Sequence, residues 1–251
     1  MKDEKIINGN CWVAYFDILG FKNETHLNKG QLPVLAYMYS EVAKLINTMN
    51  EELKEVGAQY DCLWFSDSFL FYSFDDSINS YNLINFAARQ LFDYMINTKK
   101  WPLRGALTVG DFYADKNRNI YLGEALIDAI NFTEKQDWIG WVLTPNAPAK
   151  LVASGYKLFT WVDGLCFREY DVPIKRRISN NGSEQIVLDY EKLWAYHFRT
   201  TDHKRNMFMA SLQSICKKGN GLSAGQRRKY ENTLRFYEKP CQCSVCGRDV
   251  K

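Results

Sequence analysis

Histidine is scarce in this chain, and long apolar runs are absent. Three histidines among 251 residues leave little material for acid–base chemistry. No apolar stretch approaches the roughly 20 residues that span a bilayer, and residues 1–10 are charged and polar, unlike a signal peptide. We therefore expect a cytoplasmic protein that has no membrane partner.

An excess of charge of either sign is also missing. The 32 Lys and Arg residues against 29 Asp and Glu residues give a formal net charge of +3, so no field of the whole protein attracts nucleic acid. The basic residues near the C-terminus are dispersed, and no nucleic-acid reading motif accompanies them. Walker, dinucleotide-binding and Ser-His-Asp patterns are absent as well. We expect no nucleic-acid partner, and an anionic ligand would have to be held locally.

Cysteine usage excludes a secreted disulfide scaffold. The seven cysteines are an odd number at low density. Four of them are isolated and are expected to be reduced core thiols: Cys11, Cys62, Cys166 and Cys216.

The other three cysteines form a cluster whose spacing resembles that of a metal site. Cys241, Cys243 and Cys246 have ligand-like spacing but lack a second pair, so zinc is a weak prediction. His197, His203 or a partner chain could supply a fourth ligand. The alternative is a loose, reduced tail.

What is present is a large apolar fraction, 46% hydrophobic and 15% aromatic residues, enough for one globular domain with a small appendage. Hydrophobic periodicity predicts the following elements. Strands are expected at 11–18, 59–65, 69–74, 103–109, 112–121, 138–143, 158–162 and 185–188, with Gly110 as a break and Pro173 as an interruption. Helices are expected at 32–56, 78–97, 123–134, 204–218 and 225–239, and an exposed loop at 176–182. This order predicts an α+β fold, a mixed sheet with helices on one face.

Two aspartates stand where metal ligands are useful. Asp17 ends a buried strand and is followed by a turn with Gly20, which suits a metal–triphosphate site because backbone N–H groups there can face phosphates. Asp67 lies at a hairpin tip about 50 residues later and could complete a site for Mg²⁺ or Mn²⁺. Taken singly, each is more often a cap or turn residue.

Four stretches in the same order resemble the class III nucleotidyl cyclases. Residues 16–21 (FDILGF) resemble the F-x-D-I-x-G-F signature, and residues 65–67 resemble the hairpin Gly-Asp of that family. Residues 104–110 resemble its R-x-G-x-x-x-G strand, with the middle glycine displaced by one. Residues 123–134 occupy the place of its G-x-x-V-N-x-A-x-R helix. The match covers roughly residues 11 to 145.

This resemblance implies a fold and a metal site. The fold would be the ferredoxin-like class III cyclase catalytic fold, a mixed antiparallel sheet covered by helices. Residues 1–165 would form the catalytic core, and residues 166–251 a C-terminal helical extension packed on it. Asp17, Asp67 and the Ile18 carbonyl would hold two divalent ions, Mn²⁺ or Mg²⁺.

The resemblance also implies the residues that bind the nucleoside triphosphate. Arg104 matches the triphosphate-binding arginine, a planar cation with several donors; it could instead be a surface strand residue. Phe16, Gly20 and Phe21 belong to the implied substrate-binding set. Tyr60 is the candidate for contacting the base, because no lysine of the kind that reads purines occurs in residues 59–64. Asp61 is the alternative, and Tyr60 could also be a half-buried strand aromatic.

The helix after Gly123 departs from the family pattern. The transition-state Asn and Arg would fall near Ile127 or Asp128 and near Asn131 or Phe132, and the Arg is missing. Asn131 could still donate to the α-phosphate. Metals or another cation would then have to neutralise charge; the candidates are Lys22, Arg118 and Lys135.

Within the superfamily, the FDILGF form, the compact chain and the G-x-A-L-I-x-A helix look most like the pyrimidine cyclases of the Pycsar antiphage system. That implies a homodimer with composite sites, which converts UTP, or less readily CTP, into cyclic UMP or cyclic CMP and pyrophosphate. The product would act as a second messenger for a separate effector. The alternatives are a purine cyclase and a catalytically inactive nucleotide-binding module. The sequence does not choose uracil over cytosine, since they differ by a donor/acceptor swap.

Overall fold

The computed structural model describes residues 6–20, 32–53, 60–156, 166–180, 183–198, 203–218 and 222–239. The strands are β1 (Ile7–Ile18), β2 (Tyr60–Phe65), β3 (Ser68–Ser73), β4 (Leu103–Asp115), β5 (Ile120–Leu122), β6 (Gly140–Leu143), β7 (Cys166–Asn180) and β8 (Ser183–His197). The helices are α2 (Leu32–Leu53), α3 (Ile78–Asp93), α4 (Glu124–Lys135), α5 (Asn146–Ala153), α6 (His203–Lys218) and α7 (Ala224–Glu238), and a π-turn, η3 (Tyr94–Lys99), follows α3.

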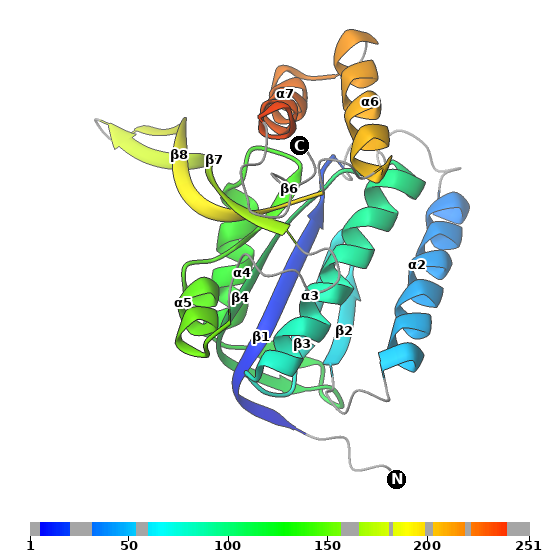
Figure 1. Ribbon diagram of the computed structural model, residues 1–251, viewed down its shortest axis with the longest axis vertical. Coiled ribbons are helices and arrows are strands. Elements are labelled where there is room, and N and C mark those ends of the chain that lie inside the picture. The colour runs from blue at the N-terminus through cyan, green and yellow to red at the C-terminus, as the bar shows by residue number, and fades with distance from the viewer. Residues whose placement is uncertain are drawn as a thin grey trace, which may run out of the picture.

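These strands form one mixed sheet, which confirms the α+β prediction. The expectation of helices on one face is wrong, because α3 and α4 pack on opposite faces of the sheet. The strand order is β2-β3-β1-β4-β6-β8-β7, with β5 paired to β4. The β4–β6 pair is parallel, and the other pairs are antiparallel. Figure 1 shows α3 crossing in front of the sheet and α6 and α7 together at one end of it.

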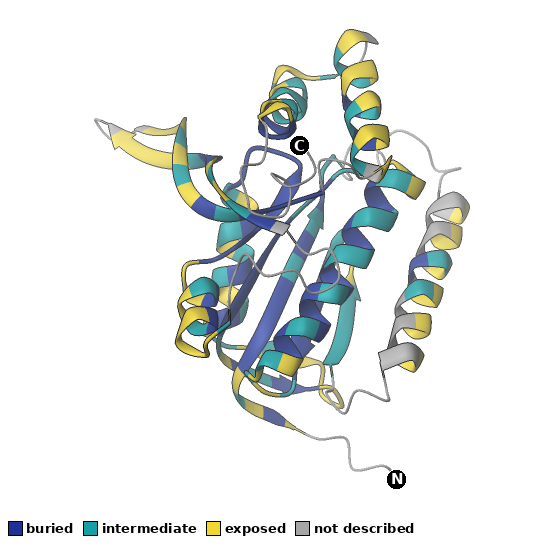
Figure 2. Ribbon diagram, in the orientation of Figure 1, coloured by how far each residue is buried: buried dark blue, intermediate teal, exposed yellow. Residues whose placement is uncertain are grey.

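The alternation of side chains along β1 decides which face each residue serves. Trp12, Ala14 and Phe16 are buried in a large cluster that includes the apolar face of α3. Cys11 and Val13 are buried on the other face, in a smaller cluster with α4. Asp17 continues this second series, so it points to the α4 side of the sheet at the end of β1. Figure 2 shows buried residues along β1 and along the inner side of α3.

Gly105 explains how β1 and β4 lie so close at this point. A Cβ built on Gly105 would be 2.3 Å from Cδ1 of the Phe16 ring, a distance that real Cβ atoms do not adopt. Glycine is thus required under the Phe16 ring. Gly110, predicted to break the strand, does not do so, because β4 continues through it, paired with Cys11 of β1. Pairing to a long central neighbour outweighs the weak strand preference of one glycine.

The prediction of an interruption at Pro173 is also wrong. β7 runs through Pro173 as the last strand in the sheet order, where a missing N–H is tolerated. Residues 176–180 belong to this strand and are not a loop, while 181–182 lie outside the described residues. The β7–β8 hairpin extends away from the rest of the fold (Figure 1). The predicted strand at 185–188 is part of β8, and the one at 158–162 lies outside the described residues.

The described helices include none that is long and apolar enough to cross a membrane. The helix predicted at 78–97 is α-helical only to Asp93 and then widens into the π-helix η3, which is capped by Lys100 in the left-handed conformation. α7 begins at a full capping box, in which Ser223 and Gln226 exchange side-chain and backbone hydrogen bonds. α7 thus has a firmly defined start beside the sheet.

Candidate active site

A cleft of about 420 Å³ lies where β1 ends. The segments that border it are the end of β1 and its turn, the β2–β3 tip, the start of β4, the end of α4, β7 and α7. Its lining residues are Tyr15, Asp17, Ile18, Leu19, Gly20, Asp67, Ser68, Arg104, Glu134, Lys175 and Lys229. The cleft therefore gathers side chains from both halves of the chain.

Asp17 and Arg104 are paired across neighbouring strands. They are directly opposite in the β1–β4 register, and Arg104 Nε and Nη2 donate to the same Asp17 oxygen, Oδ2, at 2.8 and 2.6 Å. The side chains are only 17% and 13% exposed. Burial raises the pKa of Asp17, and Arg104 opposes this rise. The second Asp17 oxygen is left facing the cleft without a hydrogen bond among the described residues.

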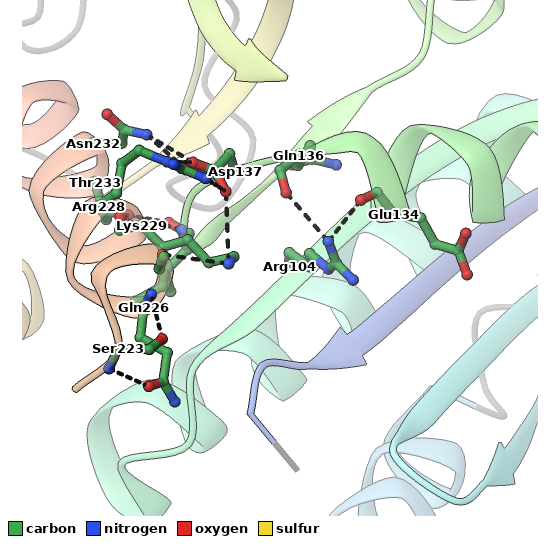
Figure 3. A network of polar contacts seen from close by, with 12 residues as sticks. Arg104, Glu134, Gln136, Asp137, Ser223, Gln226, Arg228, Lys229, Asn232 and Thr233 are labelled. Atoms are coloured by element: carbon green, nitrogen blue, oxygen red, sulfur yellow. Dashed lines mark hydrogen bonds and ion pairs between the residues drawn. The ribbon is translucent and has the colours of Figure 1, made fainter. Parts of the chain in front are cut away.

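Arg104 is held on its other side by backbone carbonyls. Its Nη1 donates to the carbonyl oxygens of Glu134 at 2.7 Å and Gln136 at 3.2 Å, as Figure 3 shows. The Gln136 side chain in turn donates to the Gly105 carbonyl at 2.9 Å. The guanidinium is thus fixed in orientation, and most of its donors are used within the protein.

The tip of the β2–β3 hairpin is tied to the end of β1. The Ile18 N–H donates to the Asp67 carbonyl at 2.9 Å, and Tyr15 and Ser68 share a hydrogen bond of 2.6 Å between their hydroxyls. Asp67 therefore lines the same cleft as Asp17, and its negative charge contributes to the raised pKa of Asp17. The two predicted metal ligands are brought together.

Ser66 makes the tight turn at this tip with φ of 54°, a left-handed conformation that costs a residue with a Cβ about 1–2 kcal/mol. We expect Ser66→Gly to raise the free energy of unfolding by about 1 kcal/mol, after the larger entropy of glycine in the unfolded chain is subtracted. Thermal unfolding measures this directly. Ser68→Gly, in the neighbouring strand, should lower the free energy of unfolding. Equal effects of the two variants would show that the backbone at Ser66 is not strained.

The oxygen ligands of this cleft suit a hard divalent cation. Mg²⁺ is usually held by one or two carboxylates plus substrate phosphates, and Asp17, Asp67 and the Ile18 backbone supply such a set. Over the described ranges, no group of three or more His, Cys, Asp or Glu side chains could hold a metal by itself. The donors therefore fit an ion shared with a bound phosphate. Cys241, Cys243 and Cys246 lie outside the described residues, so zinc stays a prediction.

Two lysines that the sequence reasoning missed complete the cleft. Lys175 of β7 makes no hydrogen bond or ion pair within the described ranges, and burial together with Arg104 and Lys229 lowers its pKa to about 8. Lys229 of α7 is 20% exposed. The loop predicted at 176–182 begins directly after Lys175, and Lys229 is one of the dispersed basic residues near the C-terminus. No local signal could have found them, since only the tertiary fold brings β7 and α7 to Asp17.

The lowered pKa of Lys175 predicts a pH dependence of anion binding. Its charge is present below about pH 8 and lost above it, and only the ammonium attracts phosphate. We expect the affinity for inorganic tripolyphosphate, measured by calorimetry without divalent ions, to fall about tenfold between pH 7 and 9.5. Lys175→Met should bind weakly at both pH values. An equally steep fall in Lys175→Met would assign the titration to another group.

Of the other residues predicted to bind substrate or act in catalysis, only some lie at the cleft. Gly20 lines the cleft with φ of 85°, whereas Phe16 is fully buried under Gly105 and does not reach it. Asn131 lines an adjoining cavity of about 370 Å³ that shares Arg104 and Lys175 with the cleft. Phe21 lies outside the described residues.

Two of the three candidate cations for charge compensation, Arg118 and Lys135, do not line the cleft. Arg118 pairs with Asp115 at 3.0 Å and is 70% exposed. Lys135 lines the adjoining cavity, where it pairs with Glu191 at 2.8 Å, and Lys22 lies outside the described residues. Among the described residues, Lys175 and Lys229 are the lysines that line the cleft.

The two candidates for base contact face opposite sides of the sheet. Tyr60 packs into the cluster on the α3 side, where burial raises its pKa and its hydroxyl has no hydrogen-bond partner among the described residues. Asp61 faces the same side as Asp17 and pairs with Lys116 at 2.7 Å. Asp61 lies opposite Tyr72 and Asp17 opposite Ser68, four residues or about 13 Å apart along β3. Neither candidate lines the cleft of its own chain.

Solved nucleotide cyclases are similar to this chain. They include an adenylyl cyclase from P. aeruginosa, at 13% identity and a TM-score of 0.43, covering 77% of this chain and 96% of that one. An adenylate/guanylate cyclase/hydrolase from Silicibacter pomeroyi is 12% identical with a TM-score of 0.47, covering 76% and 98%. The catalytic core of a rhodopsin-guanylyl cyclase, in complex with ATPαS, is 12% identical with a TM-score of 0.46, covering 77% and 98%.

No protein-family model matches the chain, and no curated protein is significantly similar to it. At these identities and TM-scores, an assignment of function depends on the residues of the cleft.

Proposed function

We propose that this protein is a metal-dependent nucleotidyl cyclase, which converts a nucleoside triphosphate into a 3′,5′-cyclic nucleotide and pyrophosphate. The observation that carries the proposal is the meeting of Asp17, Asp67 and Arg104 from separate strands in one cleft, together with the resemblance of their motifs to the class III cyclases. Lys175 and Lys229 add cations suited to the phosphates.

The reaction needs positioning more than covalent help from the protein. The ribose 3′-oxygen attacks the α-phosphorus, the bond to the bridging oxygen of the β-phosphate breaks, and the 3′-hydroxyl proton is released. Asp17 and Asp67 would hold divalent ions, which lower the pKa of that hydroxyl and neutralise the leaving pyrophosphate. Arg104 fixes the orientation of Asp17. It could bind a phosphate only if its hydrogen bonds to the Asp17 carboxylate were replaced by hydrogen bonds to the phosphate.

The charges of the cleft support an anionic ligand accompanied by cations. Three basic side chains face three carboxylates, Asp17, Asp67 and Glu134, so the lining is neutral as it stands. A triphosphate that carries about four negative charges would be only partly matched by protein donors. Divalent ions on the two aspartates supply the balance.

We further propose that the substrate is a pyrimidine nucleotide, UTP in preference to CTP. The support is the FDILGF form of the first motif and the lack of a purine-reading lysine on β2. Asp61 is a better candidate than Tyr60 for reading the base, because it faces the same side as Asp17 and holds Lys116 beside it. This pair offers both an acceptor and a donor to a base edge.

We also propose a homodimer with two composite sites, as the resemblance to the class III cyclases implies. Asp61 lies about 13 Å along the sheet from Asp17, and it is not among the residues that line the cleft. A second copy would bring its Asp61 to this cleft. The proposal also includes a division into a core of residues 1–165 and an extension of residues 166–251. A separate downstream effector would respond to the cyclic nucleotide in antiphage defence.

One assay tests the proposed function. The purified chain is incubated with each of ATP, GTP, CTP and UTP in the presence of Mn²⁺, and the products are resolved by chromatography. We expect cyclic UMP as the main product. Cyclic AMP or GMP instead would support the purine alternative, and no cyclic product from any triphosphate would overturn the enzymatic proposal.

The alternative of an inactive nucleotide-binding module has an observation in its favour. α4 carries no arginine at the transition-state position, and Arg104 is engaged by Asp17. Such a module would bind triphosphates with Mn²⁺ and release none of them as cyclic product. Calorimetric binding beside the chromatographic assay separates the two.

A further inference from the structure

The C-terminal helix α7 borders the cleft at two points. A Cβ built on Gly20, in the turn after β1, would lie 3.5 Å from Gln226 Nε2 in the first turn of α7. One turn further on, Lys229 lines the cleft together with Asp17, Asp67 and Arg104. α7 is therefore a wall of the site and does not merely pack on the outside of the domain.

A buried carboxylate fixes this wall. Asp137 is fully buried, and its Oδ2 accepts from Arg228 Nε at 2.5 Å, while its backbone carbonyl accepts from Asn232 at 2.8 Å (Figure 3). Thr233 adds a hydrogen bond of 2.8 Å from the Ile139 N–H to its hydroxyl. Asp137 directly follows Gln136, whose carbonyl accepts from Arg104. One network therefore connects α7 to Arg104, which is paired with Asp17.

Within this network, Lys229 keeps its donors largely unused. Its Nζ lies 3.6 Å from Asp137 Oδ1, beyond normal hydrogen-bond length, and 3.4 Å from the Gly225 carbonyl. Arg228 already satisfies Asp137 at shorter distance. The ammonium group of Lys229 thus stays near Asp137, whose carboxylate is already paired with Arg228. Its own donors remain available to a ligand in the cleft.

Crowding of like charges supports an anion at this place. Burial lowers the pKa of Lys175, and Arg104 and Lys229 lower it further, while Asp137 and Glu134 oppose this change. Three cations facing one cleft repel one another in the free protein, and a phosphate between them would relieve that repulsion. The same cleft is lined by the main-chain turn at Leu19 and Gly20.

We propose that α7 is part of the nucleotide site and that the Lys229 ammonium binds the terminal phosphates of the triphosphate. The inference rests on the proposed function for the identity of the ligand. It assigns a phosphate-binding cation to the C-terminal helix, in a site where α4 has no arginine. Removal or displacement of α7 would then remove one phosphate-binding side chain from the site.

The experiment compares Lys229→Met with wild type, Lys229→Arg and Arg235→Met. Arg235 is an exposed cation on the same helix, outside the cleft lining, so its variant matches the loss of charge. We expect Lys229→Met to weaken inorganic tripolyphosphate binding, measured without divalent ions, roughly tenfold and to raise the KM for the nucleotide similarly. Lys229→Arg should retain most of the affinity, and Arg235→Met nearly all of it.

A second readout reports on the geometry itself. Since Lys229 helps to lower the pKa of Lys175, the pH at which tripolyphosphate binding weakens should move upward in Lys229→Met. A folded Lys229→Met protein with wild-type affinity and an unmoved pH midpoint overturns the inference, even if cyclic nucleotide is made. Conversely, if binding depends on Lys229 but no cyclic product forms, the proposed function fails and the phosphate site stands.

Discussion

Asp17→Asn is expected to reduce cyclic-nucleotide formation at least about 1,000-fold, because metal-assisted stabilisation of the transition state amounts to several kcal/mol. The substitution keeps the shape of the side chain and removes the charge that would hold the ion. Arg104 would retain its hydrogen bonds to the carbonyls of Glu134 and Gln136, so the fold should survive with a lowered Tm. Initial rates with saturating UTP and Mn²⁺ give the measurement.

The control for this variant is Asp111→Asn, which removes a carboxylate from an exposed position of β4. It should leave the rate within about twofold, as surface substitutions do. Nucleotide binding adds a second test. Mn²⁺ should tighten UTP binding to the wild type, and this gain should vanish in Asp17→Asn. A variant that keeps both the gain and a tenth of the activity would show that Asp17 is not a metal ligand.

Arg228→Ala is expected to lower the free energy of unfolding by about 3 kcal/mol, although Arg228 is one of the more exposed residues of its network. Its partner Asp137 has a side chain with 0% exposure, against 48% for Arg228. Removal of the exposed partner leaves a buried carboxylate with weaker contacts, namely Lys229 at 3.6 Å and the Asn232 amide at 3.5 Å, and such a stranded charge costs several kcal/mol. The Tm should fall by roughly 6–12 °C for a chain of this size.

The sign of the coupling makes this prediction specific. Adding Asp137→Asn to Arg228→Ala removes the stranded charge, so the double variant should be more stable than Arg228→Ala alone. If Arg228 contributed mainly by packing, the two losses would add. Chemical denaturation of the four proteins in the cycle distinguishes these outcomes. Arg228→Ala should also weaken tripolyphosphate binding, because Lys229 would turn toward the vacated carboxylate.

Local pattern sufficed for the elements that carry the two aspartates. The alternation in residues 11–18 places Asp17 on the face opposite Trp12 and Phe16, and small polar residues between two aromatic runs place Asp67 at a hairpin tip. Both features follow from the period of two along a strand and from turn chemistry, which depend on neighbours in sequence. The α+β class followed from the order of elements.

Errors arose where distant residues decide the outcome. Gly110 and Pro173 both suggest breaks when read alone, yet a central neighbour holds the first in a strand and an edge position tolerates the second. Phe16 belongs to the core because Gly105 of another strand makes room for its ring. Each of these depends on which strands become neighbours, which local periodicity does not encode.

By itself, then, the sequence determined the element order, the two carboxylates at strand ends and the motifs that resemble a cyclase. The tertiary structure alone decided that Arg104 pairs with Asp17 and that Lys175 and Lys229 line the cleft. It also placed Asp61, and not Tyr60, on the face of the sheet that carries Asp17. The physical reason is that carboxylates at turns have local signatures, whereas a cation on β7 or α7 looks like any solvated lysine until packing carries it out of water and toward other charges.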